Sequence, residues 1–95
     1  MIARAPATIT VHRGALVYTR GTLTRGTKAC VGYPLSLYVK PASRTTYLAV
    51  RRGLTDSTGS VHFAVQANET TRFQYTLRVS DTTRVHSAIT ELIVR

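Results

Sequence analysis

The feature that most limits the fold of this chain is a regular alternation of apolar and other side chains between residues 60 and 79. The apolar positions are Val61, Phe63 and Val65 in the first half and Phe73, Tyr75, Leu77 and Val79 in the second. A period of two residues is typical of an extended strand that buries one face. We therefore expect two strands that follow each other along the chain. Phe63 in the first and Leu77 in the second should be buried from opposite sheets.

Segments of strand character run along the whole chain and are separated by turns. We expect seven strands, at residues 8–11, 15–23, 31–40, 45–54, 60–65, 72–79 and 85–94. Asp56 and Gly59 accept the backbone angles of a tight turn before the fifth strand. No ten-residue stretch has apolar positions at helical spacing. This pattern predicts an all-β chain folded as one antiparallel β-sandwich domain over residues 7–95.

Other parts of the chain are less regular. Residues 1–6 are expected to form a flexible N-terminal arm, because Pro6 resists both helix and central strand. In two strands the sequence does not decide which face is buried. In the strand at 85–94, Ile89 and Ile93 compete with Leu92 and Val94 for the interior. In the strand at 15–23, Leu16 and Tyr18 share one face and Val17 and Thr19 the other, and a bulge at Gly21 would turn Leu23 inward.

The charge of the chain predicts the chemistry of its partner. Thirteen Lys and Arg residues stand against four Asp and Glu residues, which gives a formal net charge of +9 over 95 residues. Eleven of the thirteen are Arg, whose planar guanidinium suits paired hydrogen bonds to carboxylate or phosphate. A basic surface therefore predicts an acidic partner, either a protein surface or a nucleic acid.

The same alternation predicts where this partner binds. If Leu35, Leu37 and Val39 point inward, the residues between them point outward, and the same holds for the strand at 72–79. In a sandwich of this kind the third and sixth strands are neighbours in one sheet. Their shared outer face would carry an aromatic residue among cations. The predicted partner-binding residues are Tyr38, Lys40, Arg72 and Arg78.

Residues with catalytic or metal-binding chemistry occur, but not in the necessary arrangement. His86 and Ser87 are adjacent, so on a strand they point to opposite faces, which does not suit a hydrolase triad with Asp56 or Asp81. The three histidines are widely spaced and lack close ligand pairs. The single cysteine, Cys30, is expected to be a small buried residue. We therefore expect no enzyme activity, no catalytic or metal-binding residue and no cofactor.

The strand series resembles a known family. The segments YPLSLYVK, TTYLAV, TDSTGSVHFAV, ETTRFQYTLRV and VHSAIT resemble the bacterial immunoglobulin-like domains of actinobacterial surface proteins and of virion proteins from their phages. The resemblance covers roughly residues 9–94. It implies an immunoglobulin-like antiparallel β-sandwich of about seven strands. Phe73 stands where such domains often place a tyrosine, so the hydroxyl of a tyrosine corner is missing at that position.

The resemblance also implies a function. A free-standing domain of this kind is similar to phage accessory proteins that decorate a capsid or tail, so the expected partner is an acidic surface of a capsid or tail structural protein. The expected location is the virion, assembled in the host cytoplasm, without membrane contact. Two alternatives remain open: a basic nucleic-acid-binding β-domain, which would need exposed aromatics for base stacking, and a surface adhesion module, which would need export although no signal peptide is visible.

Overall fold

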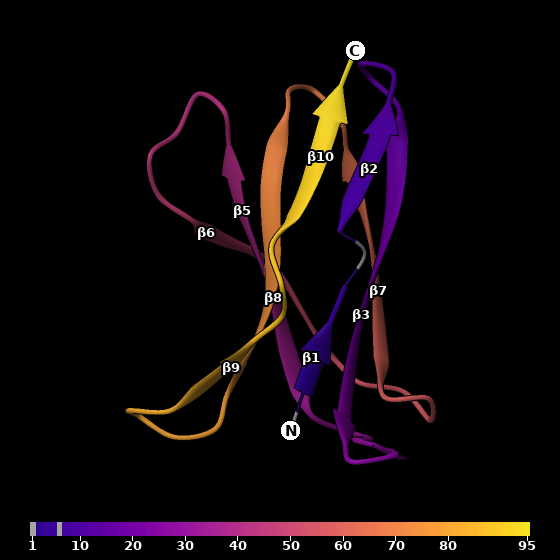
Figure 1. Ribbon diagram of the computed structural model, residues 1–95, viewed down its shortest axis with the longest axis vertical. Helices are drawn as coiled ribbons and strands as arrows, with labels where there is room; N and C mark the ends of the chain where they lie inside the picture. The colour runs from indigo at the N-terminus through magenta and orange to yellow at the C-terminus, as the bar shows by residue number, and fades with distance from the viewer. Residues whose placement is uncertain (1, 6) are drawn as a thin grey trace.

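The computed structural model describes residues 2–5 and 7–95, and within these the chain forms strands and no helix (Figure 1). This confirms the all-β prediction. The strands lie in two sheets that pack face to face, as a sandwich does. In chain order they are β1 (Ile2–Arg4), β2 (Thr8–Val11), β3 (Leu16–Arg25), β4 (Lys28–Ala29), β5 (Pro34–Pro41), β6 (Leu48–Leu54), β7 (Ser60–Gln66), β8 (Thr71–Arg78), β9 (Arg84–His86) and β10 (Thr90–Val94).

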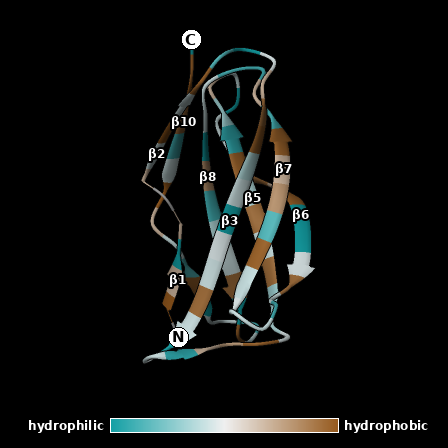
Figure 2. Ribbon diagram, turned by 90° about the vertical axis from the view of Figure 1, so that its right-hand side faces the viewer, coloured by the Kyte–Doolittle hydropathy of each residue, from teal (hydrophilic) through white to brown (hydrophobic). Residues whose placement is uncertain are grey.

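The smaller sheet is built on the long strand β3. It pairs antiparallel with β7 over most of its length, and with β1 and β4 near its C-terminal end. The larger sheet has the order β2-β10-β8-β5-β6, and β9 pairs with the C-terminal half of β8. Its pairs are antiparallel except for β10 and β2, which run parallel, so this sheet is mixed. Figure 2 views the smaller sheet and shows β6 beside β7 at one edge of the sandwich.

The N-terminal residues are more ordered than the sequence predicts. Residues 2–4, expected in a flexible arm, form β1 and pair with β3, and Ala3 is buried. The next strand, β2, belongs to the other sheet, so the chain changes sheets between Arg4 and Thr8. Met1 and Pro6, which also belong to the expected arm, lie outside the described residues.

The expected last strand is divided into β9 and β10 by Ser87. The amide of Ser87 donates to the carbonyl of Tyr75, but the amide of Tyr75 donates to Ser87 Oγ instead of a backbone carbonyl. The side chain therefore ends the ladder at this point, and β10 begins three residues later. Leu92 is buried and Val94 packs against the core, whereas Ile89 is exposed, which decides the phase that the sequence left open.

The strand β3 keeps one phase throughout, without the bulge predicted at Gly21. Its register against β7 is continuous from Leu16 to Thr22. Val17, Gly21 and Leu23 all face inward, while Leu16 faces solvent. A Cβ on Gly21 would lie 2.5 Å from the ring of Tyr75. Glycine is therefore present at this position because an aromatic ring occupies the space of a side chain.

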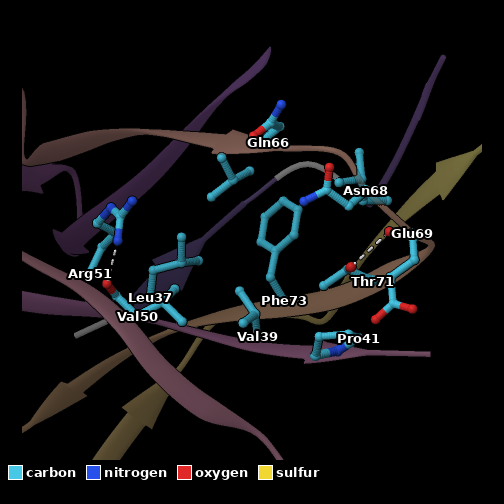
Figure 3. Close-up of a pocket in the computed structure, with 12 residues that line it drawn as sticks. Leu37, Val39, Pro41, Val50, Arg51, Gln66, Asn68, Glu69, Thr71 and Phe73 are labelled. Carbon is cyan, nitrogen blue, oxygen red and sulfur yellow. Dashed lines mark hydrogen bonds between the residues drawn. The ribbon is translucent and has the colours of Figure 1, made fainter. Parts of the chain in front are cut away.

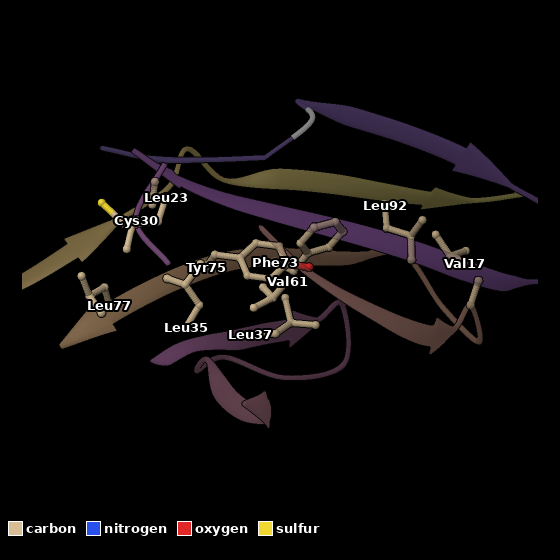
Figure 4. Close-up of a cluster of buried hydrophobic side chains, with 12 residues drawn as sticks. Val17, Leu23, Cys30, Leu35, Leu37, Val61, Phe73, Tyr75, Leu77 and Leu92 are labelled. Carbon is tan, nitrogen blue, oxygen red and sulfur yellow. The ribbon is translucent and has the colours of Figure 1, made fainter. Parts of the chain in front are cut away.

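The core lies between the sheets, and Figure 4 shows two of its aromatic rings, Phe73 and Tyr75. Tyr75 stacks against Phe63 at a centroid distance of 6.2 Å and meets Phe73 edge-on at 6.4 Å. Phe63 comes from β7 and Leu77 from β8, so they pack from opposite sheets as predicted, although Phe63 is only partly buried. Complete burial of each large apolar side chain, such as Leu35, contributes about 1.5–3 kcal/mol. Cys30 is buried at the end of this cluster, as expected.

The predicted turn between β6 and β7 is built around Asp56. One carboxylate oxygen accepts hydrogen bonds from the amides of Thr58 and Ser60, at 2.8 and 3.1 Å, and from the Thr58 hydroxyl at 2.6 Å. These hydrogen bonds lower the pKa of Asp56 from 3.8 to about 2, and the bond from the Thr58 hydroxyl has the largest effect. Gly59 completes the turn with φ at +75°, where a side chain would also meet the carbonyl oxygen of Leu23.

Candidate functional site

The candidate site is the outer face of the six-stranded sheet, which we call the basic face. The register places Lys40 opposite Arg72 and Tyr38 opposite Gln74. The residues that alternate with them are core residues, so these side chains point away from the other sheet. The predicted residues Tyr38, Lys40, Arg72 and Arg78 therefore share one face.

These four residues do not form a single cluster. Arg72 and Arg78 are six residues apart on β8, a distance of about 20 Å along an extended strand. Each is part of a separate hollow. The first, the Lys40 cluster, has Lys40, Arg44 and Arg72 around about 260 Å³, with Glu91 on its wall. The second, the Arg84 cluster, has Arg52, Arg78 and Arg84 around about 290 Å³, with Tyr38 on its wall.

Each cluster contains two cations placed directly opposite each other on neighbouring strands. Lys40 pairs with Arg72, and Arg78 pairs with Arg84. Like charges in directly opposite positions destabilise a sheet. Carboxylates offset this in part: Glu91 is opposite Arg72, and Asp81 forms an ion pair with Arg78. Among the described residues, Lys40 and Arg84 form no ion pair with a carboxylate.

Sequence reasoning missed Arg84. The residue falls between the expected strands at 72–79 and 85–94, but it begins β9, which lies beside β8. The loop at residues 79–83 is short and returns directly, with the amide of Val79 bonded to the carbonyl of Thr83. The tight return is what brings Arg84 next to Arg78.

Sequence reasoning also missed Arg52, because the alternation of β6 is interrupted. The register shifts at Leu37 and Tyr38, so that Leu37 pairs with Arg51 and Tyr38 with Ala49. This bulge places Arg52 on the outer face, opposite Ser36. Gly53 was the one signal in the sequence, because a glycine within a strand often marks a bulge or a close approach; in the structure a Cβ there would lie 3.2 Å from the ring of Phe63. Because side chains alternate along a strand, a glycine that faces the core places the preceding residue, Arg52, on the outer face.

A larger hollow opens on the opposite side of β5, between the two sheets (Figure 3). It has a volume of about 420 Å³, and its walls are mainly apolar side chains from both sheets. Phe73 points into it, and its polar rim includes Arg51 and Glu69. Glu69 already accepts a hydrogen bond from Ser43. The hollow is an opening of the core at the edge between β6 and β7, and it brings no pair of reactive groups together.

The residues considered for catalysis have structural roles. Ser87 is buried and bonds to the backbone of Tyr75 and Ala88, while His86 Nδ1 bonds to the hydroxyl of Thr76 at 2.9 Å. Asp56 holds its turn and lies 3.8 Å from His62 Nε2. Over residues 2–5 and 7–95, no group of three or more His, Cys, Asp or Glu side chains is placed to hold a metal ion.

The chain matches no protein-family model, and no curated protein matches it significantly. Within the described part of the chain, no helix is long and apolar enough to cross a membrane. The geometry and charge of the basic face are therefore the main grounds for a function.

Proposed function

We propose that this chain is a non-enzymatic, immunoglobulin-like binding module whose basic face docks on an acidic protein surface. The observation that carries the proposal is the pair of directly opposed cations in each cluster, Lys40 with Arg72 and Arg78 with Arg84. Such pairs cost stability in the free protein. A partner that supplies carboxylates offsets this cost, and Arg suits paired hydrogen bonds to carboxylates.

The immunoglobulin-like assignment is supported by the order of the strands. In that fold the second and fifth principal strands share one sheet, and the third, sixth and seventh share the other. Here β3 pairs with β7, and β8 lies between β5 and β10. β6 pairs with β5, where variable-type domains place an additional strand, and no described strand takes the place of the usual fourth strand beside β7. The sequence resemblance over residues 9–94 supports the same assignment.

The proposed partner is a structural protein of a phage capsid or tail, and the proposed location is the virion. This part of the proposal rests on the sequence resemblance, together with a face that suits a flat, repeated acidic surface. The two clusters lie about 20 Å apart along β8, so they reach two separate carboxylate groups of one surface. Tyr38, on the wall of the Arg84 cluster and opposite Gln74, is partly buried, which suits an aromatic anchor.

The low exposure of the aromatic rings near the basic face favours a protein partner over a nucleic acid. Single-strand binders stack bases on exposed aromatic rings inside a basic groove. The side chain of Tyr18 is 76% exposed, but it lies on β3 in the other sheet. Phe63 and Tyr75 belong to the core. The rings near the cations, Tyr38 and Tyr47, are both half-buried, and the Tyr47 ring lies 6.0 Å from Lys40 Nζ, so neither is a fully exposed stacking platform.

The test uses two model polyanions, poly-glutamate and single-stranded DNA, titrated across a salt series. The variant combines Arg72→Gln with Arg78→Gln, and the matched control combines Arg4→Gln with Arg25→Gln on the smaller sheet, with the same change in charge. We expect the first variant to weaken poly-glutamate binding about tenfold and the control about twofold at low salt. Equal losses in both variants would show that net charge alone attracts the polymer, and would contradict the proposal.

Two further measurements address the partner class. Tyr38→Ala should weaken docking on the protein partner by about 1 kcal/mol or more, because a buried aromatic anchor is lost. Co-sedimentation with phage capsids and tails purified from the source of the gene tests the virion location directly. Tight binding to DNA with a steep log-linear salt dependence, and no retention on particles, would favour the nucleic-acid alternative.

A further inference from the structure

The Arg84 cluster has the features of a site for one specific anion. Arg52, Arg78 and Arg84 come from three different strands and line one hollow of about 290 Å³. The floor is formed by short side chains, because Ser36 stands opposite both Arg52 and Thr76 in the register. Long cationic side chains around short hydroxyl residues leave a concave space with donors on its walls.

The charges of this hollow match an anion with two negative charges. Three arginines line the hollow, and the Asp81 carboxylate pairs with one of them, Arg78. Among the described residues, Arg52 and Arg84 have no carboxylate within 4.0 Å. Two cationic groups therefore remain without an acidic partner, and a single carboxylate would neutralise only one of them.

The hydroxyl groups of the hollow supply further donors. Thr76 Oγ1 is bonded to His86 Nδ1, but the hydroxyls of Ser36 and Tyr38 make no hydrogen bond with another described residue. Arginine and hydroxyl donors around one point are typical of sites for tetrahedral oxyanions, whose oxygens accept several hydrogen bonds at once. The Lys40 cluster is different, because Glu91 stands on the wall of its hollow.

We propose that the Arg84 cluster binds a divalent tetrahedral oxyanion of the phosphate or sulfate class. The inference deepens the proposed function, and it rests on that function for its setting: a phosphate ester on the acidic partner would bind here while carboxylates contact the Lys40 cluster. The hollow, at about 290 Å³, is many times larger than the space that one water needs. The hollow therefore admits an ester as well as a free ion.

The experiment titrates isotope-labelled protein with inorganic phosphate at pH 7.5, with sodium chloride adjusted to keep the ionic strength constant. The readout is the amide chemical shift in the nuclear magnetic resonance spectrum. We expect saturable shifts at Ser36, Arg52, Thr76 and Arg84, with a Kd in the low millimolar range. Chloride alone should produce no such shifts. Shifts that never saturate, or that spread over the whole molecule, would overturn the inference.

Matched variants separate a specific site from general attraction. Arg84→Gln and Arg52→Gln should each weaken phosphate binding about fivefold or more, because a charge-assisted hydrogen bond is lost. Arg44→Gln changes the charge equally, in the Lys40 cluster, and should change the Kd less than about twofold. All three side chains are exposed, so unchanged spectra away from the substitution verify the fold. Equal effects of Arg44→Gln and Arg84→Gln would contradict a specific site.

A second titration with O-phosphoserine distinguishes the two sources of the anion. Binding at least as tight as that of inorganic phosphate supports an ester on a partner, whereas exclusion of the ester with retained phosphate binding overturns that source in favour of the free ion. Poly-glutamate binding is measured on the same samples. Absent phosphate binding with intact poly-glutamate binding overturns the oxyanion inference alone, and the reverse result overturns the proposed docking alone.

Discussion

The hydroxyl of Tyr75, from the six-stranded sheet, is hydrogen-bonded to Thr19 Oγ1, from the four-stranded sheet, in the middle of the core. Thr19 Oγ1 in turn donates to the carbonyl of Phe63 at 3.1 Å, so the Tyr75 hydroxyl is the donor in the shared bond. Both side chains are buried. The bond joins the two sheets, and it satisfies a tyrosine hydroxyl that burial would otherwise penalise.

The first prediction concerns the two partners of this bond. Tyr75→Phe leaves Thr19 with its bond to Phe63, and should lower the free energy of unfolding by about 0.5–1.5 kcal/mol. Thr19→Val leaves the Tyr75 hydroxyl buried without an acceptor, and should cost more, about 1–3 kcal/mol. Urea denaturation of both single variants and the double variant measures the coupling. A double variant whose loss equals the sum of the single losses would contradict a direct interaction.

The same hydroxyl gives the molecule a dependence on alkaline pH. Burial raises the pKa of Tyr75 above its ordinary value of 10.0. The unfolded chain therefore loses this proton at a lower pH than the folded chain does. Stability should fall as the pH rises above about 10, and Tyr75→Phe should remove this part of the loss.

The second prediction concerns Gly21, which lies under the Tyr75 ring. In an open strand position, replacing glycine by alanine would stabilise the protein by about 0.5–1 kcal/mol. Here the new Cβ would lie 2.5 Å from the ring, so Gly21→Ala should instead destabilise by about 1–3 kcal/mol. Thermal denaturation gives the sign directly. In a Tyr75→Leu background the ring is absent, and the added cost of Gly21→Ala should shrink; an unchanged cost would refute the clash.

The third prediction concerns acid stability and Asp56. Its folded pKa, about 2, is lower than its ordinary value of 3.8, so the charged form stabilises the fold. This contribution is present above pH 4–5 and is lost as the pH falls toward 2. Asp56→Asn keeps an acceptor for the turn amides but has no proton to gain. We expect the melting temperature of the variant to fall less between pH 6 and pH 2 than that of the wild type; parallel curves would contradict the role of Asp56.

The fourth prediction concerns the cost of the basic face. Arg84→Glu places an opposite charge next to Arg78 and should raise the free energy of unfolding by about 0.2–1 kcal/mol at low salt. The gain should shrink at 1 M salt, because exposed charges are then screened. The same substitution should abolish phosphate binding. A variant that is less stable than the wild type at low salt would show that the Arg78 and Arg84 pair is not repulsive.

Alternation along the chain determined much of what could be known before the structure. It identified the inward residues of β5, β7 and β8, because the face of a residue within a regular strand depends only on its parity. The same parity placed Tyr38, Lys40, Arg72 and Arg78 on one outer face, as the register shows. The turn at Asp56 and Gly59 was also predictable, since its bonds lie within five consecutive residues.

Contacts between distant residues decided the rest, because parity does not specify which strands pair or where regularity ends. The Ser87 side chain ends the last ladder by bonding to Tyr75, twelve residues earlier. The bulge in β6 and the tight return before Arg84 bring Arg52 and Arg84 into one hollow with Arg78. Pairing with β3 orders residues 2–4. The sequence by itself determined an all-β chain with one basic outer face; the division of that face into two clusters, and the anion site proposed in one of them, depend on the register between strands.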